Sequence, residues 1–255
     1  PTTTRKSDPD FGAGPGGGVT IQRVAIIGGG FSGAMLAARL AERGVASTLI
    51  DAGGDFGIGV AYSTPFDGHL LNVRSARMSA IDGDHDHFVR WLKANHPERA
   101  EPDDFAPRRL YGLYVQDRLA EVEAAHPDLI HRFTGRAIAI DGTTVALSDG
   151  RTVAADAVVL ATGNPAPRTA SGQGRVIGDP WGKGALEVIE PDDDIVIIGT
   201  GLTMVDMVLW LDGRGWRGRA TALSRRGLLP RSHAARPDAV IAPTPQLTTG
   251  PASGR

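Results

Sequence analysis

The strongest constraint on the fold of this chain is a glycine-rich turn between a β-branched run and an amphipathic segment, and the arrangement occurs twice. In the first copy, RVAII at 23–27 precedes GGGFSG at 28–33, an alanine- and leucine-rich stretch at 34–44 and STLID at 47–51. An apolar run, a stretch of helical spacing and another apolar run are typical of a βαβ unit with parallel strands. The sequence therefore predicts an α/β fold with a parallel sheet.

The glycines of the first copy have the spacing G-x-G-x-x-G of a dinucleotide-binding turn. Gly28 would allow the tight turn, Gly30 would let the backbone approach a pyrophosphate, and Gly33 would let helix and strand pack closely. Asp51 ends the second apolar run, near the roughly 20-residue distance expected for the acid that holds a ribose hydroxyl. Strand, turn, helix and acid together predict a Rossmann-like nucleotide site rather than a plain glycine turn.

The second copy repeats the plan with one departure. Its strands are expected at 194–198 and 219–227, around a helix at 205–213. Gly199 and Gly201 take the first two glycine positions, but Met204 stands where the third glycine belongs. Helix and strand cannot approach as closely there, so an ordinary buried βαβ unit is the alternative to a second nucleotide site.

The end of the second copy carries arginines instead of an acid. Arg225 and Arg226 follow the expected strand, where a guanidinium suits a ribose 2′-phosphate and gains nothing from a bare hydroxyl. This favours NADPH over NADH. The alternative is a basic turn that only faces solvent.

The region between the two copies predicts further elements. Helices are expected at 87–92 and 105–125, and a strand at 156–163. Residues 136–153 alternate as a small antiparallel β-meander, with turns at Asp141-Gly142 and Asp149-Gly150.

Composition narrows the chemistry. The 27 Lys and Arg against 29 Asp and Glu provide no global field to attract nucleic acid or an anionic membrane. The absence of cysteine excludes disulfides, thiolate metal sites and redox-active thiol pairs, so any electrons must travel on a bound cofactor. With no apolar leader or spanning segment in the sequence, we expect a cytoplasmic location.

The two nucleotide units, the Ala161-Thr162-Gly163 tripeptide and the order of these pieces resemble the two-dinucleotide-fold flavoproteins. The segments GVAYSTP at 59–65, HLLNVRSARMSA at 69–80, DHFVRWL at 86–92, Asp179-Pro180-Trp181 and GTGLTMVD at 199–206 narrow the resemblance to a bacterial FAD/NAD(P)-binding group. This group is related to flavin-dependent N-hydroxylases and urate hydroxylase. The resemblance implies an FAD-dependent oxidoreductase acting on a small molecule, with NADPH reducing the FAD. Because the absence of cysteine argues against a disulfide reductase, we expect a monooxygenase-like reaction ahead of a simple oxidase or dehydrogenase.

The resemblance also implies a set of cofactor contacts, although it names no catalytic acid or base. Gly28, Gly29, Gly30, Phe31, Ser32 and Gly33 would surround the FAD pyrophosphate, and Asp51 would bind the ribose. Asn72, Met78 and Ser79 would lie near the flavin, the backbone of Ala137 near the adenine, and Thr162 and Gly163 beside the cofactor. For Asn72 and Met78 the alternative is a loop amide and a core filler.

Other chemistries find less support. The run Asp84, His85, Asp86 and His87 contains metal-ligand types, but its position predicts an exposed turn in which Asp86 caps a helix. Tyr111 and Tyr114 lack a lysine four positions later, as a short-chain dehydrogenase would require, and there is no G-x-S-x-G for a serine hydrolase. A nucleotide-binding module without turnover remains the alternative function.

These elements divide the chain into five parts. We expect a disordered leader at 1–20, an FAD-binding domain at 21–165, a connection at 166–193, a partial NAD(P)-binding βαβ unit at 194–229 and a disordered tail at 230–255. A nucleotide-binding half has βαβαβ, so the sequence reads as truncated after its second unit. Apolar surface left at that unit predicts self-association.

Overall fold

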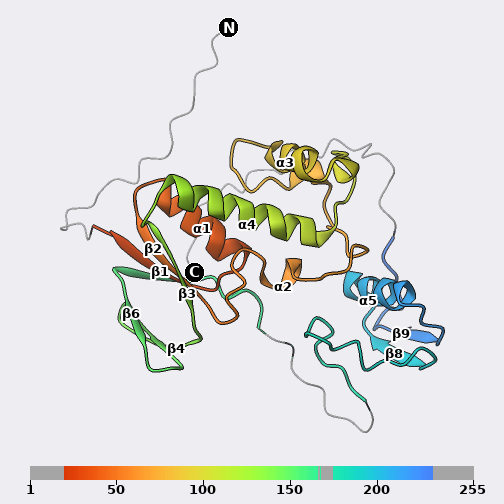
Figure 1. Ribbon diagram of the computed structural model, residues 1–255. Coiled ribbons are helices and arrows are strands. Elements are labelled where there is room, and N and C mark those ends of the chain that lie inside the picture. Colours follow the sequence, from red (N-terminus) through yellow and green to blue (C-terminus); the bar gives the residue numbers. More distant parts are fainter. Residues whose placement is uncertain (1–19, 166, 168–174, 232–255) are drawn as a thin grey trace, which may run out of the picture.

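The computed structural model describes residues 20–165, 167 and 175–231 (Figure 1). The expected leader at 1–20 and tail at 230–255 lie almost entirely outside these residues, so both stay predictions. Within them, no helix is long and apolar enough to cross a membrane.

The first unit is built on a parallel sheet with the strand order β3-β2-β1-β7. Its strands are β1 (Arg23–Ile27), β2 (Ala46–Asp51), β3 (Ile130–Thr134) and β7 (Ala157–Leu160). In the register of the sheet, Ile27 lies between Ile50 and Leu160. The turn that follows β1 therefore begins at the carboxyl edge of the sheet, where open α/β sheets bind their ligands.

Two long helices cover one face of this sheet. The helix α1 (Phe31–Ala41) packs against α4 (Arg108–Ala125), and Figure 1 shows the two running side by side. The face of α1 that is buried consists of small residues, namely Gly33, Ala34, Ala37, Ala38 and Ala41. Since these side chains are short, α1 can lie close to both the sheet and α4.

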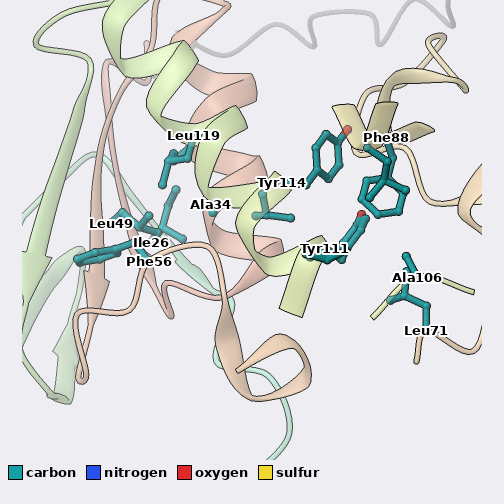
Figure 2. Close-up of a cluster of buried hydrophobic side chains, with 14 of the residues drawn as sticks. Ile26, Ala34, Leu49, Phe56, Leu71, Phe88, Ala106, Tyr111, Tyr114 and Leu119 are labelled. Atoms are coloured by element: carbon teal, nitrogen blue, oxygen red, sulfur yellow. The ribbon is translucent and has the colours of Figure 1, made fainter. Parts of the chain in front are cut away.

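The core on this face joins the sheet to the helices (Figure 2). Ile26 and Leu49 from the strands are fully buried, as are Tyr114 and Leu119 from α4. Shorter elements complete this side: α2 (Gly59–Tyr62), α3 (His87–Asn95) and the 3₁₀ turns at Ser75–Arg77 and Pro97–Arg99.

The predicted meander is confirmed and covers the other face. Its strands are β4 (Ala137–Asp141), β5 (Thr144–Leu147) and β6 (Thr152–Ala154), joined antiparallel. Val145, Leu147 and Val153 form a second core with Ala25 and Ile50 of the parallel sheet.

The second unit consists of β8 (Ile195–Ile198), α5 (Leu202–Gly213) and β9 (Ala220–Leu223), with the two strands parallel. The predicted βαβ order is therefore confirmed. Both glycine-turn helices begin three residues earlier than their periodicity indicates, at Phe31 and Leu202, because Gly30 and Gly201 already act as N-caps in extended conformation.

Candidate functional site: two glycine turns at the ends of parallel strands

The first glycine turn depends on Gly28, which has a positive φ of +110°. Its N–H donates to the carbonyl oxygen of Ile50 at 2.8 Å, so the turn leaves β1 while still bonded to β2. A Cβ at Gly28 would lie 2.2 Å from the carbonyl oxygen of Ala161. Only glycine fits this turn.

The other two glycines of the motif have different surroundings. A Cβ at Gly33 would lie 1.9 Å from the carbonyl oxygen of Gly28, so Gly33 lets α1 pack onto its own turn. At Gly30 the nearest atom to a Cβ would be the Cα of Gly59, at an ordinary contact distance of 3.4 Å. The protein itself therefore tolerates a methyl group at Gly30, and the lack of a side chain there fits a backbone that a ligand approaches.

Asp51 organises the loops around this turn. Its Oδ2 accepts a hydrogen bond from the N–H of Gly29 at 2.9 Å, and its Oδ1 accepts from Gly53 at 2.9 Å and Gly54 at 3.0 Å. A carboxylate has about four lone-pair positions. Three backbone donors therefore leave room for about one further donor, such as a ribose hydroxyl.

A glycine-rich loop that the sequence analysis did not assign lies against the turn. Gly57 donates to the carbonyl oxygen of Gly29 at 2.7 Å, and Gly59 places its Cα beside that of Gly30. Both have positive φ, +94° and +59°. The signal that could have identified this loop is the run GGDFGIG at 53–59, which begins two residues after Asp51.

The ring of Phe31 packs against two tyrosines. Its ring centroid lies 6.4 Å from that of Tyr62 and 5.8 Å from that of Tyr111. Burial raises the pKa of both tyrosines above the ordinary value, so both hydroxyls stay protonated at neutral pH. Phe31 is half-buried, and Ser32 beside it is exposed.

The second glycine turn repeats the first in detail. Gly199 has a φ of +114°, and its N–H donates to the carbonyl oxygen of Leu223 at 2.7 Å, as Gly28 does to Ile50. Gly201 caps α5 in extended conformation, as Gly30 caps α1. A Cβ at Gly199 would meet nothing within 4 Å among the described residues, in contrast to the crowded Gly28. This looser turn agrees with Met204 at the third glycine position.

Arg225 and Arg226 follow β9 and are exposed. Ser224, which follows Leu223 as Asp51 follows Ile50, accepts a hydrogen bond from the N–H of Gly227 at 3.0 Å and closes the turn that carries them. No ion pair to either arginine occurs within the described part of the chain. A guanidinium group is a suitable partner for a phosphate.

A sequence profile described as FAD-NAD(P)-binding matches residues 25–165, more than half of the chain, from within β1 to beyond β7. The chain belongs to the FAD-NAD(P)-binding family. This confirms the predicted family resemblance, the fold class and the pairing of FAD with a nicotinamide nucleotide as the cofactors of this family.

Two solved structures share the fold. One is a lysine monooxygenase, NbtG, from Nocardia farcinica, with 14% identity, a TM-score of 0.55, and coverage of 80% of this chain and 57% of that one. The other is OTEMO in complex with FAD and NADP, with 21% identity, a TM-score of 0.53, and coverage of 79% of this chain and 38% of that one. The chain thus spans about half the length of these relatives or less. A search of curated protein sequences found no match.

Three further residues predicted to contact FAD lie in the first unit. Thr162 lies beside the first turn, since a Cβ at Gly28 would lie 3.0 Å from its backbone nitrogen, and Gly163 follows it with a positive φ of +65°. Ala137, at the start of β4, packs against the core beneath the meander. Their roles toward a cofactor stay predictions.

The residues predicted near the flavin make contacts of their own. Met78 packs against the main core, as its alternative role requires, and Asn72 is exposed. The hydroxyl of Ser79 accepts from the N–H of Ile81 at 3.1 Å and lies 2.5 Å from the carbonyl oxygen of Asp84. The described contacts do not join these three residues to the glycine turn.

The Asp84 to His87 run has contacts within the protein. Asp84 pairs with Arg90 at 2.6 Å, and His87 Nδ1 lies 2.8 Å from the hydroxyl of Tyr114. Burial lowers the pKa of His87 below its usual value. Asp86 stands at the N-cap of α3, as predicted, but its side chain makes no capping hydrogen bond.

Proposed function

We propose that this protein is an FAD-dependent, monooxygenase-like oxidoreductase in which NADPH reduces FAD and the reduced flavin passes electrons to oxygen or a small organic acceptor. Membership of the FAD-NAD(P)-binding family supports the coarser part of this statement. The observation that carries the rest is the pair of matching glycine turns, at Gly28 and Gly199, each bonded to its neighbouring strand. Two such turns in one chain suit two nucleotides.

In the first unit, the chain's own groups suit the pyrophosphate and ribose of FAD. Gly30 leaves the backbone accessible, and the helix N-terminus beginning at Phe31 directs N–H groups and partial positive charge toward a phosphate. Asp51 has about one acceptor position left for a ribose hydroxyl. When bound, FAD would supply a ring that accepts hydride and passes electrons onward, chemistry that no side chain provides.

In the second unit, Gly199, Gly201 and the N-terminus of α5 would hold the NADPH pyrophosphate. Arg225 and Arg226 would bind its 2′-phosphate. Because the sequence has no cysteine, a relay through a protein disulfide is excluded, which favours transfer to oxygen or an organic acceptor.

The test begins with the purified protein, incubated with FAD and desalted. Retained yellow colour that is bleached by NADPH without oxygen supports the proposal. A protein that takes up no FAD overturns it for this chain.

A nucleotide-binding module without turnover is the second candidate, favoured by Met204 at the third glycine position of the second unit. Such a module would hold FAD or an ADP-like ligand in the first turn only. A yellow protein whose spectrum NADPH leaves unchanged would support it.

A further inference from the structure

Four segments that carried the family resemblance meet at one place in the structure. Thr64, His69, Trp181 and Asp206 come one from each of the segments 59–65, 69–80, 179–181 and 199–206. Arg108, the first residue of α4, joins them where α5 approaches the first unit (Figure 1). We call these five residues the interunit clasp.

The centre of the clasp is an ion pair withdrawn from water. Arg108 Nη2 lies 2.8 Å from Asp206 Oδ2, and the two side chains are only 17% and 10% exposed. Arg108 also donates through Nε to the carbonyl oxygen of Leu70 at 2.9 Å, and its guanidinium lies 5.4 Å from the ring centroid of Trp181. Removing one charge of such a buried pair destabilises the protein, because the other charge is then left away from water without a partner of opposite sign.

His69 ties the same helix to the first unit a second time. The ring is 2% exposed, with Nε2 at 2.9 Å from the backbone carbonyl of Asp206 and Nδ1 at 2.5 Å from the Thr64 hydroxyl. Since a carbonyl only accepts, Nε2 carries a hydrogen, and in the neutral ring Nδ1 then accepts from Thr64. Two directional contacts from different elements thus reach one residue of α5.

Aromatic side chains surround His69 and the end of α5. The rings of Phe66 and Trp181 lie edge-on to His69, with centroids at 5.0 and 5.3 Å. A Cβ at Gly213 would lie 2.9 Å from the ring of Phe66, so the end of α5 also packs against the first unit. A cavity of about 620 Å³ lies beside the clasp, and Thr64, His69, Trp181, Met207 and Trp210 line part of it.

We propose that Arg108, Asp206 and His69 are positioning residues that fix the second nucleotide unit against the first and so set the separation across which NADPH reduces FAD. This positioning role rests on the proposed function, whereas the contacts of the interunit clasp are observed independently of it. Neither the ion pair nor the His69 contacts require a bound nucleotide.

Distance measurement between two spin labels tests the geometry without any cofactor. Because the chain has no cysteine, Ala120→Cys and Asp212→Cys create unique labelling sites on exposed positions of α4 and α5. The otherwise unchanged protein should give one narrow distance distribution. Asp206→Asn, which keeps the size of the side chain but removes its charge, should broaden or shift it.

A matched control shows whether the loss of any ion pair would broaden the distance distribution. Asp192→Asn removes an exposed pair between Asp192, which precedes β8, and Arg217 of the second unit, whose side chains are 76% and 66% exposed, and should leave the distribution narrow. An unchanged distribution in Asp206→Asn, or equal broadening by both variants, overturns the proposal.

If Asp206→Asn does not fold, a double variant provides the test instead. Arg108→Met with Asp206→Leu replaces the pair by apolar groups, which commonly restores stability at such sites. Its unfolding temperature should return toward that of the wild type, while the distribution stays broader than that of the wild type because the Arg108–Asp206 ion pair is gone and only the His69 contact to the backbone of residue 206 remains. A narrow, wild-type distribution in the double variant contradicts the clasp.

The rate of flavin reduction by NADPH tests whether the interunit clasp positions the two nucleotides for electron transfer. In FAD-loaded protein without oxygen, Asp206→Asn should slow reduction by about ten- to a hundredfold while FAD retention stays unchanged. A wild-type rate despite a broadened distance distribution overturns the positioning role. If the wild type retains no FAD, the proposed function fails, and the distance measurement still decides whether the clasp exists.

Discussion

Asp51 accepts a hydrogen bond from the backbone N–H of Gly29, with a distance of 2.9 Å between nitrogen and Oδ2. Its other carboxylate oxygen accepts from Gly53 and Gly54. The residue that the sequence assigns to ribose binding therefore also joins the glycine turn to the loop after β2. It shapes the site before any ligand is present.

Replacing Asp51 should affect both stability and binding. Asp51→Ala removes charge-assisted hydrogen bonds to three N–H groups, so the free energy of unfolding should fall by about 1 to 3 kcal/mol, and FAD binding should weaken by a similar amount. Denaturant unfolding and FAD titration measure the two effects. Asp82→Ala, which removes a carboxylate that is 94% exposed, is the control. Unfolding of Asp51→Ala at the wild-type denaturant concentration would contradict the role.

The glycines of the first turn should separate folding from binding. Gly33→Ala places a methyl group 1.9 Å from a backbone oxygen and should lower the unfolding temperature markedly. Gly30→Ala meets only an ordinary contact, so it should unfold like the wild type but fail to retain FAD, and its loss of binding should exceed that of Asp51→Ala. Thermal unfolding and flavin absorbance distinguish the two variants. Wild-type retention of FAD by Gly30→Ala would show that Gly30 is not a ligand position.

The two βαβ units could be predicted because their signals are local. A β-branched run, a glycine turn and helical spacing lie within about thirty residues. The strand β3 was missed because it lies at the edge of the sheet, where His131 and Arg132 are exposed and the apolar pattern is broken.

The parts of the site that sequence reasoning missed depend on distant contacts. The backbone donors to Asp51 follow from the course of a loop, which no periodicity encodes. The clasp joins Arg108 to Asp206 across 98 positions and His69 to Asp206 across 137. Its segments could be recognised by resemblance, but nothing in their spacing indicates that they meet.

The two arginines after β9 should decide the choice of nicotinamide nucleotide. Replacing Arg225 and Arg226 with alanine should weaken NADPH binding about ten- to a hundredfold and leave NADH nearly unchanged, because only NADPH carries the 2′-phosphate. Direct titration of both nucleotides measures this. Arg217→Ala removes an exposed arginine of the same unit and should change neither affinity. Equal weakening of both nucleotides would make the arginine pair structural.

The exposed face of the β8-β9 sheet predicts self-association. Ile198 is 90% exposed, and Val196 and Leu223 on the same face are 65% and 54% exposed. Contiguous apolar surface of this kind favours contact between copies. Size-exclusion chromatography should show a larger species as concentration rises, and Ile198→Lys should reduce it. A compact, salt-insensitive monomer at all concentrations would contradict this expectation.

The most direct test of the central claim is an anaerobic titration of the FAD-loaded protein with NADPH, followed by the visible absorbance of the flavin. We predict that the desalted protein retains FAD, that NADPH bleaches its absorbance, and that admitted air restores it. A protein that retains no FAD, or one whose retained flavin NADPH leaves fully oxidised, would contradict the proposed electron transfer.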